Sequence, residues 1–266
     1  MERSGEMSDT SVSDWWSSAI IDMEPGKIHL RGQPIESLIE SAGFVDMVWL
    51  MCLGQSPSAQ QRRVLEAAMV ASVDHGPQAP SIAAARMAAT CGVGINNAMA
   101  SGVNLLGDVH GGAGQQYLEL AYQIRAAYRD GQPLELAVKE QVESYQRMHD
   151  RFVPGFGHRF HKPTDPRSEP LLRILESTDD PAIDREFAKI TRAVQSHLSQ
   201  HKPLAINIDG ASATLYGALG VPPQLARGLF CLSRSVGILA HAWEQTQQGG
   251  RNKGPTPPSY RWTYTG

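Results

Sequence analysis

Cysteine is scarce in this chain. Its 266 residues include only Cys52, Cys91 and Cys231, which are too few for a disulfide framework. No two of them have CxxC spacing, so structural zinc bound through thiolates is not expected. A chain with so few cysteines fits a reducing compartment, and we expect it in the cytoplasm.

Long apolar runs and a strong charge of one sign are missing as well. No uninterrupted apolar stretch reaches the length that crosses a membrane, and residues 1–14 are polar and acidic, unlike a signal peptide. A net charge of −3 gives no electrostatic reason to expect nucleic acid. We therefore expect a soluble globular protein of one large or two modest domains, with neither a membrane nor a nucleic-acid partner.

Strand signals are also few, and most of the chain has the spacing of amphipathic helices. Segment 58–72 begins with Ser58 and Gln61 at capping-box spacing and then places apolar residues along one face. Segment 134–145 has a weaker helical pattern. Only segment 26–35 looks like a short extended or hairpin element. The predicted fold class is therefore all-α.

Two more helices are predicted in the C-terminal half. In 180–198, Asp180 can cap the helix and Pro181 suits its first position. Another helix is predicted to begin at Pro222, and its expected apolar face consists of Leu225, Leu229, Leu232, Val236 and Leu239. The last residues, 247–266, are rich in glycine and proline and cannot form a regular helix, so their aromatic residues are expected to dock on another surface.

Four short stretches combine catalytic residue types with glycine. They are VDHGP around His75, GDVHGGAG around His110, GFGH around His158 and NIDGAS around Asp209. Glycine lets backbone amides approach a ligand closely. The third stretch lies in VPGFGHRFHKPTDPR, residues 153–167, whose glycine and proline density excludes a regular helix and is typical of a functional loop.

Three kinds of chemistry could use these residues. A metal site is the first, since histidine and aspartate suit zinc or iron, but HExxH is absent and the one tight pair, His158 and His161, lies in a loop. A nucleophilic hydrolase is the second, but the chain has no GxSxG motif. Neither chemistry is favoured, and no metal ligand is predicted.

Proton abstraction next to a carbonyl fits the residues best. A carboxylate base removes a carbon-bound proton, histidines donate hydrogen bonds to the oxygen that gains charge, and arginines bind substrate carboxylates. The arginine candidates are Arg159, Arg167 and Arg234. A single histidine beside glycine is more often a turn or core residue than a catalyst, and His161 and His241 are interpreted as structural.

The stretch PGFGHRFHKPTDPR resembles the signature of the citrate synthase superfamily, in which a Gly-x-Gly-His loop is followed by Asp-Pro-Arg. DHGPQAPS, GDVHGGAG, INIDGASATLYGALG and LSRSVGILAHAWEQ resemble further parts of that family in the same order. PGKIHLRGQPIESLIESAGFVDMVWLMCLGQSPS resembles its entry segment, so the resemblance covers essentially the whole chain.

The resemblance implies a role for each polar stretch. His110 would hydrogen-bond the acetyl thioester oxygen and stabilise its enol, and Asp209 would be the base that removes the methyl proton. His158 would polarise the keto carbonyl of oxaloacetate or hold the citryl hydroxyl. His75 would also bind the four- or six-carbon acid.

The resemblance also implies sites for the carboxylates and for coenzyme A. Arg167 and Arg234 would bind the carboxylates of the acid, with Arg159 as a helper. In synthases an arginine of the tail crosses to the partner subunit's site; Arg261 is the nearest candidate here, and Arg251 is another. The coenzyme A adenine pocket would be formed in part by the backbone of Val153, Pro154, Gly155, Phe156 and Gly157.

The implied architecture is a homodimer of chains with two helical domains. A large domain would comprise residues 1–110 and 216–266, and a small domain would comprise residues 111–215, inserted in the large one. The active site would lie in the cleft between them and close on the substrate. The coenzyme A thioester would be a substrate, and no permanently bound cofactor is expected.

Two features bear on the reaction. The chain is shorter than an ordinary citrate synthase and similar in size to citryl-CoA lyases and to the citryl-CoA lyase module of ATP-citrate lyase, which VDHGP also resembles. His110 instead resembles synthases, because that module lacks a histidine there. We therefore expect cleavage of citryl-CoA to acetyl-CoA and oxaloacetate, with citrate synthase or 2-methylcitrate synthase as the alternative. A metal-dependent hydrolase and a catalytically silent family member are the hypotheses from other classes.

Overall fold

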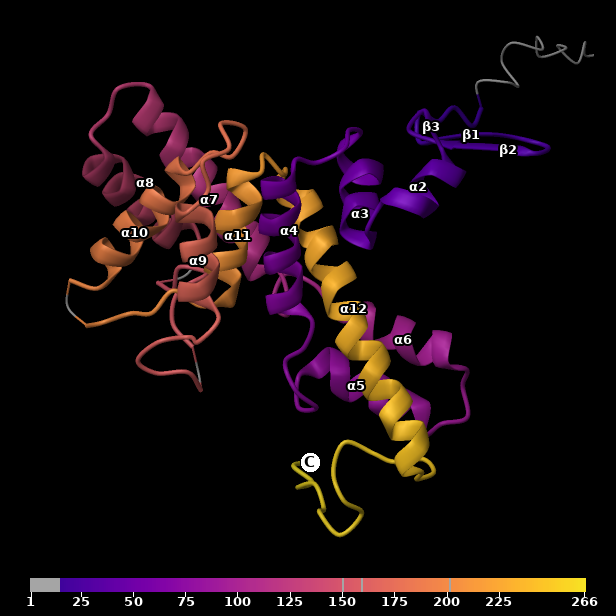
Figure 1. The fold of residues 1–266 in the computed structure, drawn as a ribbon. Coiled ribbons are helices and arrows are strands. Elements are labelled where there is room, and N and C mark those ends of the chain that lie inside the picture. The colour runs from indigo at the N-terminus through magenta and orange to yellow at the C-terminus, as the bar shows by residue number, and fades with distance from the viewer. Residues whose placement is uncertain (1–14, 150, 159, 201) are drawn as a thin grey trace, which may run out of the picture. The chain divides into compact units, whose positions relative to one another are not determined.

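The computed structural model describes residues 15–266 except 150, 159 and 201. Arg159 and the polar segment 1–14, for which no signal peptide is predicted, therefore lie outside the described residues. The described residues form eleven helices and one small three-stranded sheet (Figure 1). The expected helical fold is confirmed, with the sheet as an addition to the all-α prediction.

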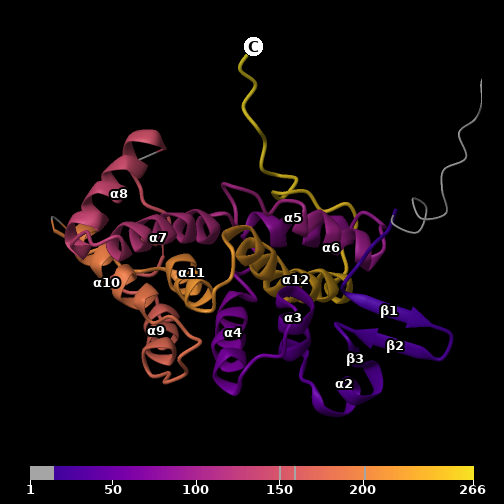
Figure 2. The same cartoon turned by 90° about the horizontal axis from the view of Figure 1, so that it is seen from above.

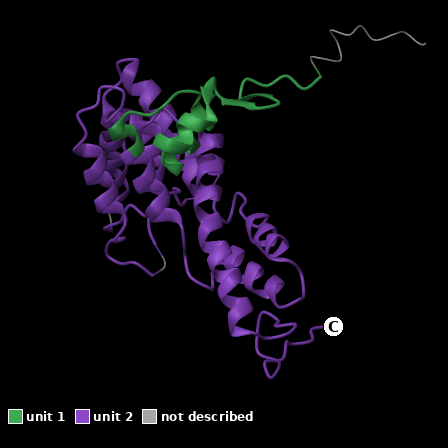
Figure 3. Ribbon diagram, turned by 45° about the vertical axis from the view of Figure 1, so that its right-hand side comes forward, with its two compact units in different colours: residues 1–62 green, residues 63–266 purple. Residues whose placement is uncertain are grey.

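The chain divides into two compact units, residues 1–62 and 63–266 (Figure 3). The predicted site residues that the structure describes all belong to the second unit. The division into a large and a small domain stays a prediction. The elements of the first unit, in chain order, are β1 (Ile21–Glu24), β2 (Lys27–Leu30), β3 (Gln33–Pro34), α2 (Ile35–Ser41) and α3 (Phe44–Leu53).

The three strands form an antiparallel sheet in the order β1-β2-β3. Ile21 pairs with Leu30, and His29 pairs with Pro34. The turn between β1 and β2 includes Gly26 at φ +80°, a conformation that residues with a side chain rarely adopt. The hairpin predicted from the sequence is thus confirmed as β2 and β3, and β1 extends it by one strand.

Helix α4 (Ala59–Ser72) begins where the sequence predicts it, because a capping box closes its first turn. The hydroxyl of Ser58 accepts the N–H of Gln61 at 3.0 Å, and the side-chain oxygen of Gln61 accepts the N–H of Ser58 at 2.9 Å. These bonds satisfy N–H groups that have no partner within the helix. The predicted apolar face is buried and consists of Val64, Leu65, Ala68, Met69 and Ser72.

The remaining helices all belong to the second unit. They are α5 (Pro80–Ala89), α6 (Ile95–Val103), α7 (Ala113–Arg129), α8 (Leu134–Met148), α9 (Ser168–Glu176), α10 (Glu186–Leu198), α11 (Ile208–Ala218) and α12 (Pro223–Gln248). α5 and α6 pack against each other and against α12, whereas α11 packs against α7, α9 and α10 (Figure 2). The helix predicted over 134–145 is confirmed as α8.

Helix α11 is buried along its whole length except at Asp209, in its first turn. Glycine allows neighbouring segments to approach it closely: a Cβ on Gly217 would lie 2.6 Å from the ring of Phe187. A helix enclosed on all sides has little freedom to shift. Asp209 is therefore presented from a rigid element.

Helix α10 begins later than predicted. Asp180 accepts the N–H of Ala182 at 2.9 Å and forms a separate turn rather than a helix cap. The turn that leads into the helix is closed by Asp184, whose carboxylate accepts the N–H of Glu186 at 3.1 Å. The helix predicted over 180–198 is thus confirmed only from Glu186 onward, because the short acidic side chains favour turns before it.

Helix α12 confirms the helix predicted from Pro222, but its predicted face is largely wrong. The exposed residues of this face are Leu232, Val236 and Leu239. The buried side is instead rich in small and polar residues and includes Ser233, Arg234, Gly237 and Ala242. A Cβ on Gly237 would lie 2.2 Å from the carbonyl oxygen of Val73, so a small residue is required where this backbone segment crosses the helix. Close backbone approach at Gly237 therefore helps to set the buried face, together with the apolar residues Leu229, Phe230 and Ile238.

The C-terminal segment 249–266 has no helix, as predicted. Its start is fixed to the end of α5, since the backbone N–H groups of Asn252 and Lys253 donate to Thr90 at 2.9 Å each. The aromatic residues beyond it are exposed, namely Tyr260, Trp262 and Tyr264. They do not dock on the described part of the chain, and their docking on another surface stays a prediction.

Candidate active site

One pocket of the second unit collects most of the predicted catalytic and acid-binding residues. It has a volume of about 300 Å³, and its walls include His75, His110, His158, Asp209 and Arg234. A wider adjoining pocket of about 930 Å³ shares His75 and His110 and adds Arg167. Loops before α5, α7 and α9, the first turn of α11 and the middle of α12 supply these six residues.

His110 is held by Ser81, a residue that the sequence did not single out. The backbone N–H of Ser81 points at Nε2 of His110 at 3.2 Å, and the Ser81 hydroxyl lies 2.9 Å from the same nitrogen. Because an N–H donor faces it, Nε2 carries a lone pair, and the proton of the neutral ring is on Nδ1. Burial lowers the pKa of His110, and Arg234 lowers it further. A neutral His110 can therefore donate Nδ1–H to an oxygen in the pocket.

His158 has the opposite tautomer. Its Nδ1 accepts the backbone N–H of Phe160 at 3.1 Å and that of His161 at 3.0 Å, so the proton of the neutral ring lies on Nε2. Burial lowers the pKa of His158 and the nearby His161 adds to the effect, while Asp165 opposes it. The pocket thus contains two histidines that donate through different ring nitrogens.

His75 lies edge-on to His158, with 5.7 Å between the ring centroids. Burial lowers the pKa of His75, and Arg234 contributes in the same direction. The preceding residue, Asp74, has its carboxylate 3.2 Å from Nε2 of His241. His241 was interpreted as structural, and this contact fixes the His75 loop to α12.

Asp209 is placed by Asn207, the N-cap of α11. The side-chain oxygen of Asn207 accepts the N–H of Asp209 at 2.9 Å and that of Gly210 at 3.2 Å, while its amide donates to the carbonyl of Gly157 at 2.8 Å. The helix start and the glycine loop also touch directly, since a Cβ on Gly210 would lie 2.3 Å from the carbonyl oxygen of Gly155. The base and the loop therefore form one rigid assembly.

Charge in the pocket comes from one carboxylate and nearby arginines. Burial raises the pKa of Asp209, while Arg234 and Arg167 lower it. Arg234 is only 4% exposed; its Nε donates to the carbonyl of Ser72 at 3.0 Å, and its guanidinium lies over the ring of Phe230. These contacts hold Arg234 in the pocket wall, where it can bind a substrate carboxylate.

Asp165 is another residue that the sequence analysis left without a role. Its buried carboxylate accepts Nε and Nη2 of Arg167 at 2.9 and 2.8 Å, together with the backbone N–H groups of Arg167 at 3.0 Å and Ile208 at 3.2 Å. Burial alone would raise the pKa of Asp165, but the bonds from Arg167 hold it below its ordinary value. Asp165 thus fixes Arg167 to the start of α11, one residue before Asp209.

The sequence contains signals for some of these supporting residues. Asn207 directly precedes a helix and is a favoured N-cap residue type. Asp165 belongs to the Asp-Pro-Arg tripeptide, in which only Arg167 received a role. Ser81 has no local signal, because it lies 29 positions before His110 and only the fold joins them.

The predicted adenine segment borders a pocket of about 1000 Å³, which shares Gly157 and His158 with the catalytic pocket. Of its five residues, those in the pocket wall are Val153, Phe156 and Gly157. Gly155 is instead packed against Gly210, and neither it nor Pro154 belongs to this wall. The same wall also contains the basic side chains of Arg151, Lys162 and Lys202. Apolar surface and positive charge together suit an anionic nucleotide.

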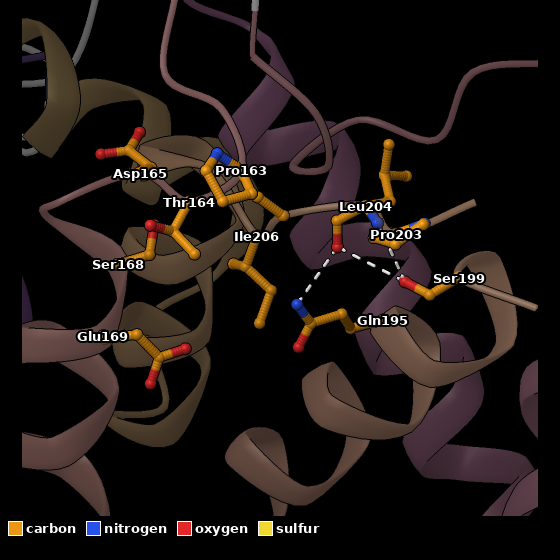
Figure 4. A pocket seen from close by; sticks show the side chains of 11 residues that line it. Pro163, Thr164, Asp165, Ser168, Glu169, Gln195, Ser199, Pro203, Leu204 and Ile206 are labelled. Atoms are coloured by element: carbon orange, nitrogen blue, oxygen red, sulfur yellow. Dashed lines mark hydrogen bonds between the residues drawn. The ribbon is translucent and has the colours of Figure 1, made fainter.

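A further hollow of about 320 Å³ lies beside Asp165 (Figure 4). Among the described residues of its lining there is no histidine, and the Glu169 carboxylate pairs with Arg192 at 2.7 Å. The amide of Gln195 donates to the carbonyl of Leu204 at 3.1 Å, as one of the dashed lines in Figure 4 shows. These polar groups serve the packing of α9 and α10, and we assign no chemistry to this hollow.

Arg261 lies in the exposed C-terminal segment and does not line the pockets described above. Within the described part of the chain, no three histidine, cysteine or acidic side chains lie close enough together to hold a metal ion. Among the helices of the described residues, none is long and apolar enough to cross a membrane.

Comparison with known proteins places this arrangement in a family. Residues 51–256 match the family model described as citrate synthase, C-terminal domain. The chain is 30% identical over 214 residues to citrate synthase from Haloferax volcanii. The aligned residues make up 80% of this chain and 53% of that protein. The chain thus spans about half the length of the curated relatives it matches.

Solved structures extend the likeness to the whole chain. Citryl-CoA lyase from Hydrogenobacter thermophilus superposes with a TM-score of 0.81 at 27% identity, covering 95% of each chain. ATP citrate lyase from Methanothrix soehngenii, solved in complex with citrate and coenzyme A, has a TM-score of 0.79 at 19% identity and covers 100% of this chain and 45% of that one. At that identity the second likeness concerns the fold alone. From the family match and these relatives, we conclude that the chain belongs to the citrate synthase family.

Proposed function

We propose that this protein is a citryl-CoA lyase, which cleaves citryl-CoA to acetyl-CoA and oxaloacetate through the enol(ate) of acetyl-CoA. The observation that carries the proposal is the meeting of Asp209 with His110 and His158 in one pocket. Cleavage of this carbon–carbon bond needs an acid that gives a proton to the carbon next to the thioester. It also needs hydrogen-bond donors for the thioester oxygen and for the hydroxyl oxygen that becomes the keto carbonyl. These three side chains supply that set.

The reaction follows from the protonation states of the three groups. The bond between the carbinol carbon and the CH₂ of the thioester arm breaks, and its electron pair moves into the thioester. The thioester oxygen gains charge and accepts Nδ1–H of His110. Asp209 in its protonated form gives a proton to the CH₂ carbon. The hydroxyl proton passes to solvent as the keto carbonyl forms, and Nε2–H of His158 hydrogen-bonds the oxygen that loses it. Solvent then returns a proton to the Asp209 carboxylate, so the enzyme ends the cycle as it began it. One proton leaves oxygen and one reaches carbon.

The acid would be bound by charge and hydrogen bonds. Arg167 and Arg234 would bind its carboxylates, and His75 would donate a further hydrogen bond. The Asp165 carboxylate orients Arg167 through two side-chain bonds at 2.9 and 2.8 Å. In a homodimer, Arg261 of one chain would complete the site of its partner, with Arg251 as the other candidate. The homodimer is itself part of the proposal.

Coenzyme A would act as the carrier of the substrate and not as a permanent cofactor. Its nucleotide would occupy the pocket of about 1000 Å³ beside the glycine loop, where Arg151, Lys162 and Lys202 can meet its phosphates. The proposed small domain, residues 111–215, would close over the substrate and restrict the access of water. We place the enzyme in the cytoplasm.

Citrate synthase or 2-methylcitrate synthase is the alternative. Curated relatives of this chain include proteins named citrate synthase and citrate/2-methylcitrate synthase, which favours the alternative. A solved structure named citryl-CoA lyase matches this chain with a TM-score of 0.81 at 27% identity, which favours the lyase. Both enzymes would share the same groups, and they differ in whether water reaches the citryl thioester.

Product analysis tests the proposal. Purified protein is incubated with synthetic citryl-CoA, and acetyl-CoA, oxaloacetate, citrate and free coenzyme A are quantified against a reaction without enzyme. The lyase predicts equal amounts of acetyl-CoA and oxaloacetate. Citrate with free coenzyme A would establish the synthase alternative. No turnover of citryl-CoA to either pair of products would contradict both.

A further inference from the structure

A small cavity lies behind Asp209, on the side formed by α11, α12 and the start of α7. It leaves about 10 Å³ for the centre of a water molecule, and its walls include Asp209, Ser212, Tyr216 and Arg227. A space of this size holds one water molecule if two or more polar groups face it. Asp209 also lines the catalytic pocket, so this residue belongs to the walls of both spaces.

Two polar atoms on residues of the cavity wall are buried without a hydrogen-bond partner in the described part of the chain. They are the hydroxyl of Tyr216, a residue only 2% exposed, and Nε of Arg227. A buried donor that lacks a partner costs about 1–3 kcal/mol of folding free energy, so native proteins rarely leave one unsatisfied. Two such donors in the wall of one cavity indicate a shared acceptor between them.

The remaining polar groups of the wall can accept the two hydrogen bonds that a water molecule donates. Asp209, Ser212 and Tyr216 are spaced by three and four residues, so they share one face of α11. The hydroxyl of Ser212 donates to the carbonyl of Asp209 at 3.3 Å, which leaves its oxygen able to accept. Arg227 is oriented by Asp108, whose Oδ1 accepts Nη2 at 2.6 Å. These residues of the wall therefore carry two donors and two acceptors.

We propose that this cavity binds one water molecule, which accepts from the Tyr216 hydroxyl and Arg227 Nε–H and donates to the Asp209 carboxylate and Ser212 Oγ. All four hydrogen-bonding positions of the water are then used. Tyr216 becomes a positioning residue, which acts on Asp209 through the water and touches no substrate. The assignment of the water stands on the cavity alone, whereas its effect on catalysis rests on the proposed function of Asp209.

The water has a defined effect on the proposed base. A hydrogen bond donated to a carboxylate favours its ionised form, and this opposes the burial that raises the pKa of Asp209. The bond also holds one carboxylate oxygen toward the cavity and leaves the other for the substrate. Burial raises the pKa of Tyr216 far above its ordinary value, so its hydroxyl remains a donor throughout the working pH range.

Tyr216→Phe tests the proposal, because it removes the hydroxyl and keeps the ring. The readout is exchange of the acetyl-CoA methyl hydrogens in D₂O with oxaloacetate present, measured by mass spectrometry as a function of pH. Exchange needs ionised Asp209, so its rate falls as the pH drops through the pKa of this group. We expect the midpoint of that fall to move up by about half a pH unit or more, with an unchanged KM for acetyl-CoA. Ser212→Ala should move it in the same direction.

Tyr122→Phe is the matched control. The hydroxyl of Tyr122 donates to the carbonyl of Val221 at 3.3 Å, and Tyr122 is not part of the cavity wall. This variant should keep the wild-type midpoint. A wild-type midpoint in Tyr216→Phe as well would overturn the proposed effect on Asp209.

A crystal structure of the wild-type protein tests the water itself. Density for one water molecule within hydrogen-bond distance of Tyr216 Oη and Arg227 Nε is the expected result. A well-resolved cavity without electron density for a water molecule would overturn the proposal. This test uses the wild-type protein, so it holds even if Tyr216→Phe fails to fold. Wild-type protein that shows no methyl exchange would instead contradict the proposed function and leave the crystallographic test of the water unaffected.

Discussion

The hydroxyl of Ser81 lies 2.9 Å from Nε2 of His110, and the backbone N–H of Ser81 points at the same nitrogen at 3.2 Å. Ser81 lies in the first turn of α5, whereas His110 precedes α7. Two contacts at one nitrogen fix both the ring orientation and the tautomer of His110. They aim the opposite ring nitrogen, which carries the proton, at the pocket.

Ser81→Ala should therefore weaken catalysis without abolishing it. The backbone N–H still faces His110, so only the contact of the hydroxyl is lost, and a single hydrogen bond contributes about 0.5–1.5 kcal/mol. We expect kcat to fall by roughly tenfold or less, with little change in KM, in steady-state cleavage of citryl-CoA. Ser101→Ala, which removes an exposed hydroxyl bonded within α6, is the control. Equal rates in both variants would show that the Ser81 hydroxyl does not position His110.

The two catalytic histidines should give opposite tautomers in solution. Nitrogen-15 NMR of histidine-labelled protein near neutral pH should show the proton on Nδ1 of His110 and on Nε2 of His158, because each other nitrogen accepts a backbone N–H. Burial lowers the pKa of both rings, so both should titrate below the ordinary value of about 6.5. His110→Gln and His158→Gln assign the signals. Matching tautomers, or a charged ring near neutral pH, would contradict the mechanism.

Asp165→Asn should destabilise the protein and remove part of its pH dependence. The bonds from Arg167 hold the pKa of Asp165 below its ordinary value, against the effect of burial. The ionised carboxylate thus adds stability that is present above the ordinary aspartate pKa and is lost as the pH falls through the lowered pKa of the folded state. The variant should lose on the order of 3 kcal/mol in the free energy of unfolding near neutral pH.

Urea unfolding over a pH series measures this effect. The loss caused by Asp165→Asn should shrink as the pH approaches the lowered pKa, because wild type then loses the same ion pair. Asp130→Asn, at the exposed end of α7, should leave the curve unchanged. A loss that stays constant across the acidic range would show that packing, and not ionisation, accounts for the role of Asp165.

Gly210→Ala should disrupt the junction between the glycine loop and α11. A Cβ at this position would lie 2.3 Å from the carbonyl oxygen of Gly155, so the backbone has to move. We expect a loss of about 1–3 kcal/mol in the free energy of unfolding and a marked loss of activity, since Asp209 is the adjacent residue. Gly228→Ala on α12 is the matched control, because a Cβ on Gly228 would meet nothing within 4 Å and alanine favours a helix. Similar unfolding curves for the two variants would contradict the close contact.

Helices and polar loops were predictable from the sequence, but their contacts were not. The capping box of Ser58 and Gln61 marks the start of α4, because that signal is local. The buried face of α12 was mispredicted, since crossing backbone near Gly237 helps to set it and no local pattern reports such a crossing. The start of α10 was mispredicted because several acidic residues compete as turn formers.

The candidate active site likewise has residues that the sequence reveals and contacts that it does not. The motifs name His110, His158 and Asp209, because glycine beside a titratable residue is visible in the chain. The tautomers of the histidines depend on Ser81 and on the backbone at Phe160, which only the fold brings to the rings. Burial of Asp209 within α11 and the cavity behind it likewise arise from packing between distant segments.

The most direct test of the central claim is the rate of citryl-CoA cleavage by Asp209→Asn. Asparagine has the shape of aspartate but cannot transfer the proton, and burial already disfavours the charged form, so the fold and citryl-CoA binding should be retained. We expect cleavage to fall by about a thousandfold or more, the scale of a lost general acid–base group. A correctly folded Asp209→Asn protein that cleaves citryl-CoA at the wild-type rate would contradict the account.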